Sequence, residues 1–162
     1  MRLIGKHILM IVTDGVDRDE YVQLKEGFES EQATVIVTSP QNYLTVETIQ
    51  DGRRGEDILI DVPFDALEGI QFDGLVIPDG ILSSDFLKKD KRVLHMVLQF
   101  HKKRLPIFAS GNAVQVLYET QVLFSQVVVR ESTPLPQFLD KAVEVLLDHV
   151  PFTHVYRPTM VL

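Results

Sequence analysis

Five short apolar runs, separated by helix-like stretches, constrain the fold of this chain more than any other feature of its sequence. The runs are residues 6–13, 33–39, 72–78, 106–109 and 127–129. Several are rich in β-branched residues, which is typical of buried strands. Strands that alternate with helices form a parallel sheet covered on both faces. We therefore expect an α/β fold, a three-layer α/β/α sandwich with a mostly parallel sheet.

The stretches between these runs have the spacing of amphipathic helices. Helices are expected over residues 19–32, in a short segment capped by Ser83 or Ser84, from Asp90 to His101, and over residues 114–118 and 136–148. Serine and aspartate favour helix N-caps because their side-chain oxygens accept hydrogen bonds from free backbone amides. Residues 51–55 and 58–62 interrupt the alternation, and we expect an excursion or hairpin at the sheet edge there.

Length and composition indicate one domain. With 162 residues, 45% of them hydrophobic, the chain can form one core but not two of ordinary size. We assign residues 1–148 to this domain and residues 149–162 to a tail, either mobile or strapped over a neighbouring surface. The longest apolar run is far shorter than the ~20 residues that span a bilayer, so neither a membrane anchor nor a signal peptide is expected.

Charge and cysteine content exclude several partners and chemistries. The formal net charge of −7 disfavours a nucleic-acid binder, which needs a clustered basic surface. Without cysteine the chain has no disulfide, no thiolate metal site and no cysteine nucleophile, and a cytoplasmic location suits it. The spacing of histidines and carboxylates matches no recognised ligand pattern, so no metal and no cofactor are expected.

The segment from Leu105 to Leu117 contains an apolar run that ends in Ser110, Gly111 and Asn112 and continues as a helix. Many α/β enzymes place a catalytic nucleophile at such a turn. An ordinary strand-to-helix turn, capped by serine or asparagine, explains the same residues. No thiol stands here, so cysteine chemistry is excluded at this turn.

Four stretches of the chain, taken in order, resemble the PfpI/ThiJ family. They are ILMIVTDGVDRDEYVQLKEGFESEQATVIVTSP, FDGLVIPDG, VLHMVLQFHKKRLPIFASGNAVQVL and PLPQFLDKAVEVLLD. Family members share a fold with class I glutamine amidotransferases, so the resemblance implies a flavodoxin-like sheet. They typically carry a Glu after the first strand, a Pro-Gly-Gly turn after the third and a Cys-His pair after the fourth. Such groups meet at the carboxyl ends of the strands, where open α/β sheets bind ligands.

The resemblance, carried over residue by residue, places changed residues at the first two of these positions. Asp17 stands where the family has its Glu, with Asp19 and Glu20 as alternatives if the register differs. Asp79 replaces the first glycine of the turn and precedes Gly80. A carboxylate there would repel the negative charge that the amides of the turn stabilise.

At the third position, the resemblance places Gly111 at the cysteine and Asn112 at the histidine. A nucleophile elbow forces a non-glycine residue into a strained backbone conformation that costs about 1–3 kcal/mol. Glycine adopts that conformation freely. If the turn is kept, Gly111 relieves the strain and stabilises the fold while the chemistry is lost.

Ser110 is the remaining candidate nucleophile. It would need a histidine base oriented by a carboxylate. The histidines of the first strand and of the helix before the fourth strand lie away from the elbow. His149 and His154 in the tail could reach it, most simply from a partner subunit. We therefore assign no catalytic residue.

The region after the elbow is shorter than in the family. The run 127–129 leads almost at once into the last helix, whereas the family usually inserts another helix and a strand or hairpin. This run is either the strand after the elbow helix or the family's final strand, and the sequence leaves both open. A missing layer would expose apolar surface, which favours a homodimer or larger assembly, as the resemblance also does.

Three functions are consistent with these observations. The first is a pseudoenzyme without the cysteine-dependent hydrolase or glyoxalase activity, which binds a small ligand or a partner. The residues expected to line its pocket are Asp17, Asp79, Gly80, Ser110, Gly111 and Asn112. The second is a residual hydrolase or glyoxalase-like enzyme that uses Ser110 or a water activated by Asp17. The third is a chaperone-like or regulatory subunit that acts through its surface.

Overall fold

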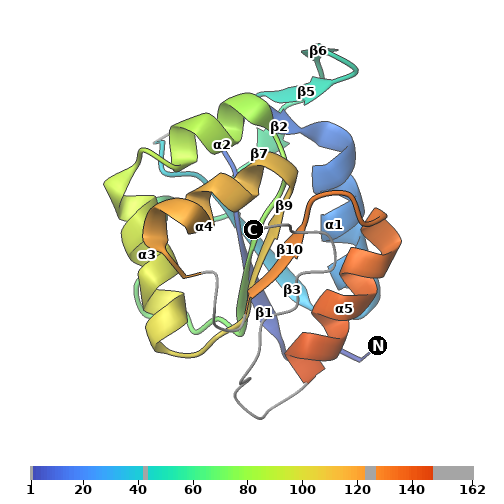
Figure 1. The fold of residues 1–162 in the computed structure, drawn as a ribbon, viewed down its shortest axis with the longest axis vertical. Helices are drawn as coiled ribbons and strands as arrows, with labels where there is room; N and C mark the ends of the chain where they lie inside the picture. Colours follow the sequence, from blue (N-terminus) through green and yellow to red (C-terminus); the bar gives the residue numbers. More distant parts are fainter. Residues whose placement is uncertain (1, 42–43, 123–126, 148–162) are drawn as a thin grey trace.

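The computed structural model describes residues 2–41, 44–122 and 127–147. A five-stranded sheet forms its centre, and every neighbouring pair in this sheet is parallel (Figure 1). The strands are β1 (His7–Ile11), β3 (Thr34–Thr38), β8 (Gly74–Ile77), β9 (Ile107–Ser110) and β10 (Val127–Arg130). Their spatial order is β10-β9-β8-β1-β3, which is the flavodoxin-like order and confirms the predicted α/β class.

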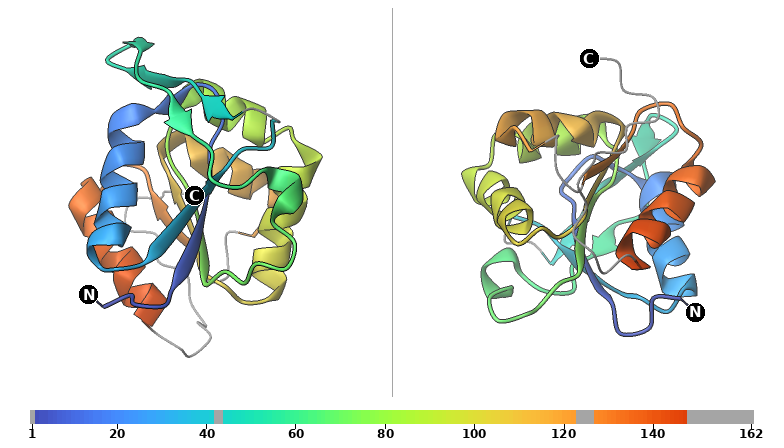
Figure 2. Two further views of the ribbon diagram at one scale, coloured as in Figure 1. Left: turned by 180° about the vertical axis from the view of Figure 1, so that it is seen from behind. Right: turned by 60° about the horizontal axis from the view of Figure 1, so that its bottom comes forward.

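Helices cover both faces of this sheet (Figures 1 and 2). On one face lie α1 (Arg18–Ser30) and α5 (Leu135–Leu147); on the other lie α2 (Ile81–Leu87), α3 (Lys91–Lys102) and α4 (Val114–Thr120). Alternate residues of β1 point to opposite faces, so Ile8 and Met10 join the core under α1 and α5. Leu9 and Ile11 join the core under the other helices. A strand buried on both sides reads as a continuous apolar run, which explains the sequence pattern.

The segment between β3 and β8 forms two small sheets, one of which also includes a short strand that follows β1. β2 (Val16–Asp17), β5 (Thr48–Gln50) and β6 (Arg53–Arg54) make one; β4 (Thr45–Val46) and β7 (Ile58–Leu59) make the other, and the 3-10 turn η1 (Phe64–Ala66) follows. The β5–β6 hairpin projects from the molecule (Figure 2). After β7, Asp61 covers the outer edge of β3: its amide donates to the carbonyl of Val37 at 2.9 Å and its carboxylate accepts from the Val37 amide at 2.8 Å. The predicted excursion at the sheet edge therefore protects that edge.

Helix starts follow the capping predictions in one case and not in another. Asp90 caps α3, because its Oδ1 accepts from the amides of Arg92 and Val93. The prediction that Ser83 or Ser84 caps α2 is wrong, since α2 begins at residue 81. The hydroxyl of Ser83 instead accepts from the amide of Thr13 at 3.2 Å and ties α2 to the end of β1.

The structure describes the last predicted strand and the last predicted helix, but not the predicted tail. β10 lies parallel beside β9 and α5 follows it, so the run 127–129 is a strand of the central sheet. The predicted tail, residues 149–162, lies outside the described residues. No helix in the described ranges is long and apolar enough to cross a bilayer.

Candidate functional site

The candidate site lies at the carboxyl ends of β1, β8 and β9. β3 pairs with one side of β1 and β8 with the other, so the direction in which the sheet is built reverses between β1 and β8. Open α/β sheets bind ligands at such a switch point, because the loops that leave the two strands part there. The residues expected to form the site end or follow these three strands: Asp17, Asp79, Gly80, Ser110, Gly111 and Asn112.

The turn after β9 has the backbone of an elbow. Ser110 ends the strand in an extended conformation, with φ −119° and ψ 134°. Gly111 has φ +58°, in the left-handed region that other residues rarely adopt. The 3-10 turn η2 (Gly111–Ala113) then leads into α4. The elbow conformation is kept, and glycine occupies it without strain.

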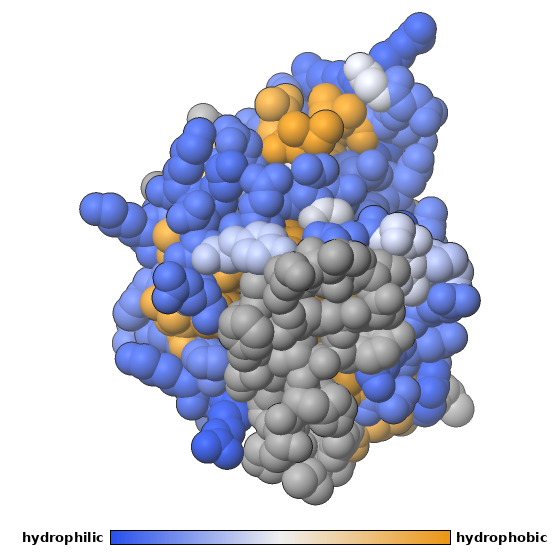
Figure 3. Space-filling model, in the orientation of Figure 1, coloured by the Kyte–Doolittle hydropathy of each residue, from blue (hydrophilic) through white to orange (hydrophobic). Residues whose placement is uncertain are grey.

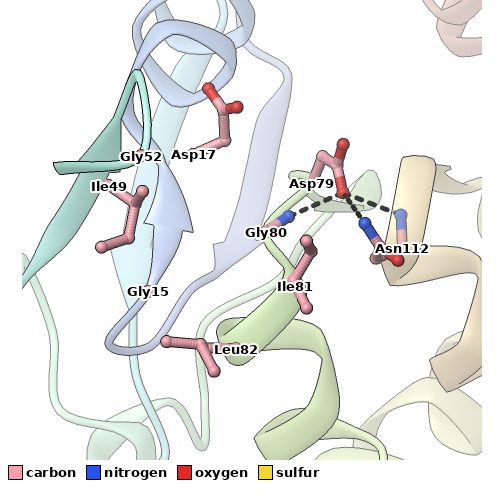
Figure 4. Close-up of a pocket in the computed structure, with 9 residues that line it drawn as sticks. All are labelled: Gly15, Asp17, Ile49, Gly52, Asp79, Gly80, Ile81, Leu82 and Asn112. Carbon is pink, nitrogen blue, oxygen red and sulfur yellow. Dashed lines mark hydrogen bonds between the residues drawn. The ribbon is translucent and has the colours of Figure 1, made fainter.

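The carboxylate of Asp79 accepts three hydrogen bonds on one oxygen (Figure 4). Its Oδ1 accepts from the Gly80 amide at 2.7 Å, from the Asn112 amide at 2.8 Å and from the Asn112 side chain at 3.0 Å. Backbone amides in such turns hold the oxyanion in acyl-transfer enzymes. From the sequence, Asp79 was expected to repel an oxyanion; in the structure its own carboxylate accepts the hydrogen bonds from these donors.

Asp79 also fills the space above Gly111. A Cβ atom built on Gly111 would lie 2.3 Å from both Cγ and Oδ2 of Asp79. Non-bonded heavy atoms prefer separations of about 3.5–4.0 Å. A side chain at position 111 and the carboxylate of Asp79 in this conformation therefore exclude each other.

A second carboxylate, that of Glu20, lies beside the turn that carries Asp79. Glu20 belongs to the first turn of α1 and is only 8% exposed. Its Oε1 accepts from the Asp79 amide at 2.7 Å, and its Oε2 accepts from Nη1 of Arg130 at 2.9 Å. Burial raises the pKa of the Glu20 carboxyl, and hydrogen bonds from Ser110 and the Asp79 amide offset part of this rise.

Arg130, the last residue of β10, joins Glu20 to the elbow. Its Nη1 also donates to Oγ of Ser110 at 2.9 Å, and its Nε donates to the carbonyl of Thr133 at 2.6 Å. Arg130 stands opposite Ser110 in the β9–β10 register. Sequence reasoning missed this residue; the available signal was a charged residue directly after a buried run, at the same sheet edge as the elbow.

Asp17, which the resemblance placed at the family's Glu, uses its side chain to cap α1. Its Oδ1 accepts from the Glu20 amide at 3.0 Å, so it is the N-cap of α1. Its backbone amide donates to the carbonyl of Asp79 at 2.9 Å. Glu20, the alternative considered for a different register, lies against Ser110 and Asp79 instead.

Replacing Asp17 with alanine is expected to lower the free energy of unfolding by about 1 kcal/mol, because the first turn of α1 loses its cap. Asp17→Asn keeps an accepting oxygen and should cost much less. Urea unfolding of the two variants measures both values. Equal losses would show that the charge of Asp17, and not its hydrogen bond to Glu20, stabilises the helix.

Ser110 is fully buried, and its hydroxyl contacts two charged groups. These are the guanidinium of Arg130 and the carboxylate of Glu20. Within the described ranges, no histidine forms a hydrogen bond with Ser110. His149 and His154 lie outside the described residues. This environment favours a structural role for the hydroxyl.

A cavity of about 480 Å³ opens beside Asp79 (Figure 4). Four of the expected site residues line it: Asp17, Asp79, Gly80 and Asn112. Ser110 and Gly111 are not among its walls, which are completed by Gly15, Ile49, Gly52, Ile81 and Leu82. An apolar surface patch lies over the start of α2 (Figure 3), where Ile81 and Leu82 are 73% and 64% exposed. The cavity thus combines carboxylates and an amide with an apolar rim.

Metal ligands do not gather in the part of the chain that the structure describes. No group of three or more His, Cys, Asp or Glu side chains is placed there to hold a metal ion. The polar groups of the site are the carboxylates, one guanidinium, one hydroxyl and the amides described above.

Residues 6–144 match the family model of the DJ-1/PfpI family. The chain belongs to the DJ-1/PfpI family. The putative cysteine protease YraA of Bacillus subtilis is 29% identical to it over 120 residues, which are 74% of this chain and 68% of the relative. Protein/nucleic acid deglycase 2 of Escherichia coli is 28% identical over 121 residues, 74% of this chain and 67% of the relative. The resemblance predicted from the sequence is confirmed.

Solved structures of DJ-1/PfpI proteins share the fold. Drosophila melanogaster DJ-1beta superposes with a TM-score of 0.76 and 18% identity, covering 89% of this chain and 91% of that one. A ThiJ/PfpI domain protein from Brachyspira murdochii gives a TM-score of 0.73 and 19% identity, covering 88% and 98%. These matches confirm the predicted sandwich of helices on both sides of a mostly parallel sheet.

Proposed function

We propose that this DJ-1/PfpI protein lacks the cysteine-dependent hydrolase or glyoxalase activity and binds a small neutral or cationic ligand in the cavity beside Asp79. The observation that carries the proposal is the Asp79 carboxylate on the amides of Gly80 and Asn112, directly above Gly111. The amides that would stabilise an oxyanion already bind a negative charge, and the elbow carries no side chain. A nucleophile and an oxyanion site are thus missing at the same place.

The cavity walls support a ligand with hydroxyl or ammonium groups and a short apolar part. Asp17 and Asp79 bring carboxylates, and Asn112 brings an amide. Ile49 and Ile81 bring apolar surface, and the lining contains neither lysine nor arginine. Attraction between opposite charges is stronger near a protein surface than in bulk water, so the two carboxylates favour a cation over an anion.

A residual hydrolase is supported less well. Ser110 is buried and bonded to Arg130 and Glu20, and Asp17 uses its carboxylate to cap α1. General-base help from one carboxylate supplies at most about 10²–10⁴-fold, which is small beside an ordinary enzyme. A chaperone-like or regulatory role would use the exposed Ile81 and Leu82, but the same side chains rim the cavity.

We expect no turnover of methylglyoxal or of an activated ester above the buffer rate for the wild type, for Ser110→Ala or for Asp17→Asn. The same samples are then screened by thermal unfolding against amines, polyols and carboxylates. A ligand that binds the folded state at 100 times its Kd stabilises it by about 2.7 kcal/mol, so an amine or polyol should raise Tm.

Asp79→Asn and Asp17→Asn should weaken the binding of a cationic ligand, whereas Asp140→Asn, an exposed aspartate on α5, serves as the control. A rate that Ser110→Ala abolishes would overturn the proposal and identify a serine enzyme. If neither cavity variant weakens binding, the ligand does not bind in this cavity, and a role of the outer surface becomes the better explanation.

We further propose that the protein forms a homodimer or larger assembly and acts in the cytoplasm. Large apolar side chains are exposed at Leu44, Leu59, Ile81 and Leu82. Clustered exposed apolar surface commonly marks an interface. A chain without cysteine suits a reducing compartment. Light scattering at several concentrations tests the assembly, and a monomer at every concentration would contradict it.

A further inference from the structure

Three N–H donors from two separate turns converge on one point of the site. The amide of Gly80 comes from the turn between β8 and α2, and the two donors of Asn112 come from the elbow after β9. All three lie within 3.0 Å of Oδ1 of Asp79. Converging backbone N–H groups form anion-binding concavities, and hydrogen bonds to a charged acceptor are about twice as strong as neutral ones.

The anion at this point is a side chain of the protein itself, and its backbone is held on both sides. The Asp79 amide donates to the buried carboxylate of Glu20 at 2.7 Å, and its carbonyl accepts from the Asp17 amide at 2.9 Å. Gly80 lets this turn approach β2, because a Cβ there would lie 2.7 Å from the carbonyl oxygen of Gly15. The donor on Gly80 is therefore positioned by the fold and not only by the carboxylate that it binds, and Asn112 is placed by the 3-10 turn η2 that follows β9.

We propose that the amides of Gly80 and Asn112, with the Asn112 side chain, form a binding site for a small carboxylate, and that Asp79 is its tethered occupant. Removal of the Asp79 carboxylate opens the site to free carboxylate ligands. In the wild type, Asp79 excludes anionic groups from this end of the cavity. This inference does not depend on the proposed function, because the site is defined by donors that exist whether or not the wild-type cavity holds a ligand.

The chemistry of the donors selects the class of ligand. N–H groups stabilise an accepting oxygen and offer nothing to a cation. The present occupant is a carboxylate, so formate and acetate reproduce its oxygen at this position. The space that opens above Gly111, now filled by Cγ and Oδ2 of Asp79, has room for the rest of such an ion.

The test compares Asp79→Ala with Asp79→Asn. Alanine removes the acceptor and leaves the donors free, whereas asparagine keeps an accepting oxygen in place. Formate and acetate are titrated at constant ionic strength into ¹⁵N-labelled wild type and variants, and the amide shifts of Gly80 and Asn112 are followed. We expect saturable shifts in Asp79→Ala, with a Kd at least about tenfold lower than in Asp79→Asn or the wild type, because one charge-assisted hydrogen bond exceeds the 1.4 kcal/mol of a tenfold change.

Asn112→Ala in the Asp79→Ala background removes one donor and should weaken the binding of acetate. A folded Asp79→Ala protein whose Gly80 and Asn112 amides do not shift saturably would overturn the inference, as would equal binding by the wild type. If Asp79→Ala does not fold, Asp79→Gly is used instead, and refolding of either variant by acetate but not by chloride supports the site. If acetate refolds neither variant, the inference is overturned. A failure of the amine and polyol screen on the wild type would leave these outcomes unchanged.

Discussion

Gly111→Ala is expected to lower the free energy of unfolding by about 3–5 kcal/mol, because two costs act at the same position. A non-glycine residue in the left-handed conformation of Gly111, with φ +58°, costs about 1–2 kcal/mol. The added Cβ would also lie 2.3 Å from Cγ of Asp79 and push its carboxylate off the three N–H donors. A hydrogen bond to a charged group contributes about 1.5–3 kcal/mol, so the second cost is at least as large as the first.

Two further variants separate these costs in urea unfolding. Gly69 has φ +89° and nothing within 4 Å of an added Cβ, so Gly69→Ala measures the backbone cost alone. In Asp79→Gly the carboxylate is absent, and Gly111→Ala made in that background should cost about 1–3 kcal/mol less than in the wild type. The double variant can also be compared with the two single variants. If its loss of unfolding free energy equals the sum of the losses in Asp79→Gly and Gly111→Ala to within about 0.5 kcal/mol, the steric exclusion between the two positions is contradicted.

The exclusion has a chemical consequence for this DJ-1/PfpI chain. A cysteine at position 111 and the aspartate at position 79 cannot both adopt the observed conformation. The missing nucleophile and the occupied oxyanion donors are therefore coupled features of one site. The proposed loss of cysteine-dependent catalysis fits an elbow in which the Asp79 carboxylate accepts hydrogen bonds from Asn112 and fills the space above Gly111.

The central sheet could be predicted from the sequence because its strands are buried on both faces. Such strands read as continuous apolar runs, and all five expected runs lie in the parallel sheet. The parts of the two small sheets that lie between β3 and β8 were predicted only as an excursion, and β2 was not predicted. Their strands have two or three residues each, too short to show a periodic pattern. The start of α2 was misplaced because Ser83 is a good cap in isolation, while its hydroxyl is used by Thr13.

The site was predicted less completely than the fold. The sequence located Asp79, Gly111 and Asn112 correctly at strand ends, but side-chain conformation decides whether Asp79 repels an oxyanion or replaces it. The resemblance placed Asp17 at the family's Glu, and Glu20, only three positions later, was an alternative for a different register. The two-residue strand β2 makes Asp17 the cap and turns Glu20 inward, and no periodic signal distinguishes these outcomes.

Arg130 lies 110 positions from Glu20 in the sequence, so no local pattern links them. Arg130→Met is expected to lower the free energy of unfolding by about 3–5 kcal/mol at neutral pH, because it leaves the Glu20 carboxylate buried without its partner. Arg2 forms an ion pair of the same 2.9 Å length with Glu31 but is more than half exposed. Arg2→Met is the control and should change the free energy of unfolding little.

The pH dependence distinguishes a charge effect from lost packing. Burial already raises the pKa of Glu20, and removing the Arg130 cation raises it further. The folded state then keeps the proton above the ordinary glutamate pKa of about 4.3, so its stability falls as pH rises from that value through the raised pKa. The defect of Arg130→Met should therefore shrink toward pH 4 and grow toward pH 7, and Glu20→Gln in the same chain should remove this slope. A defect that stays constant between pH 4 and 7 would show that Arg130 acts by packing and by its bond to the Thr133 carbonyl, and not by compensating Glu20.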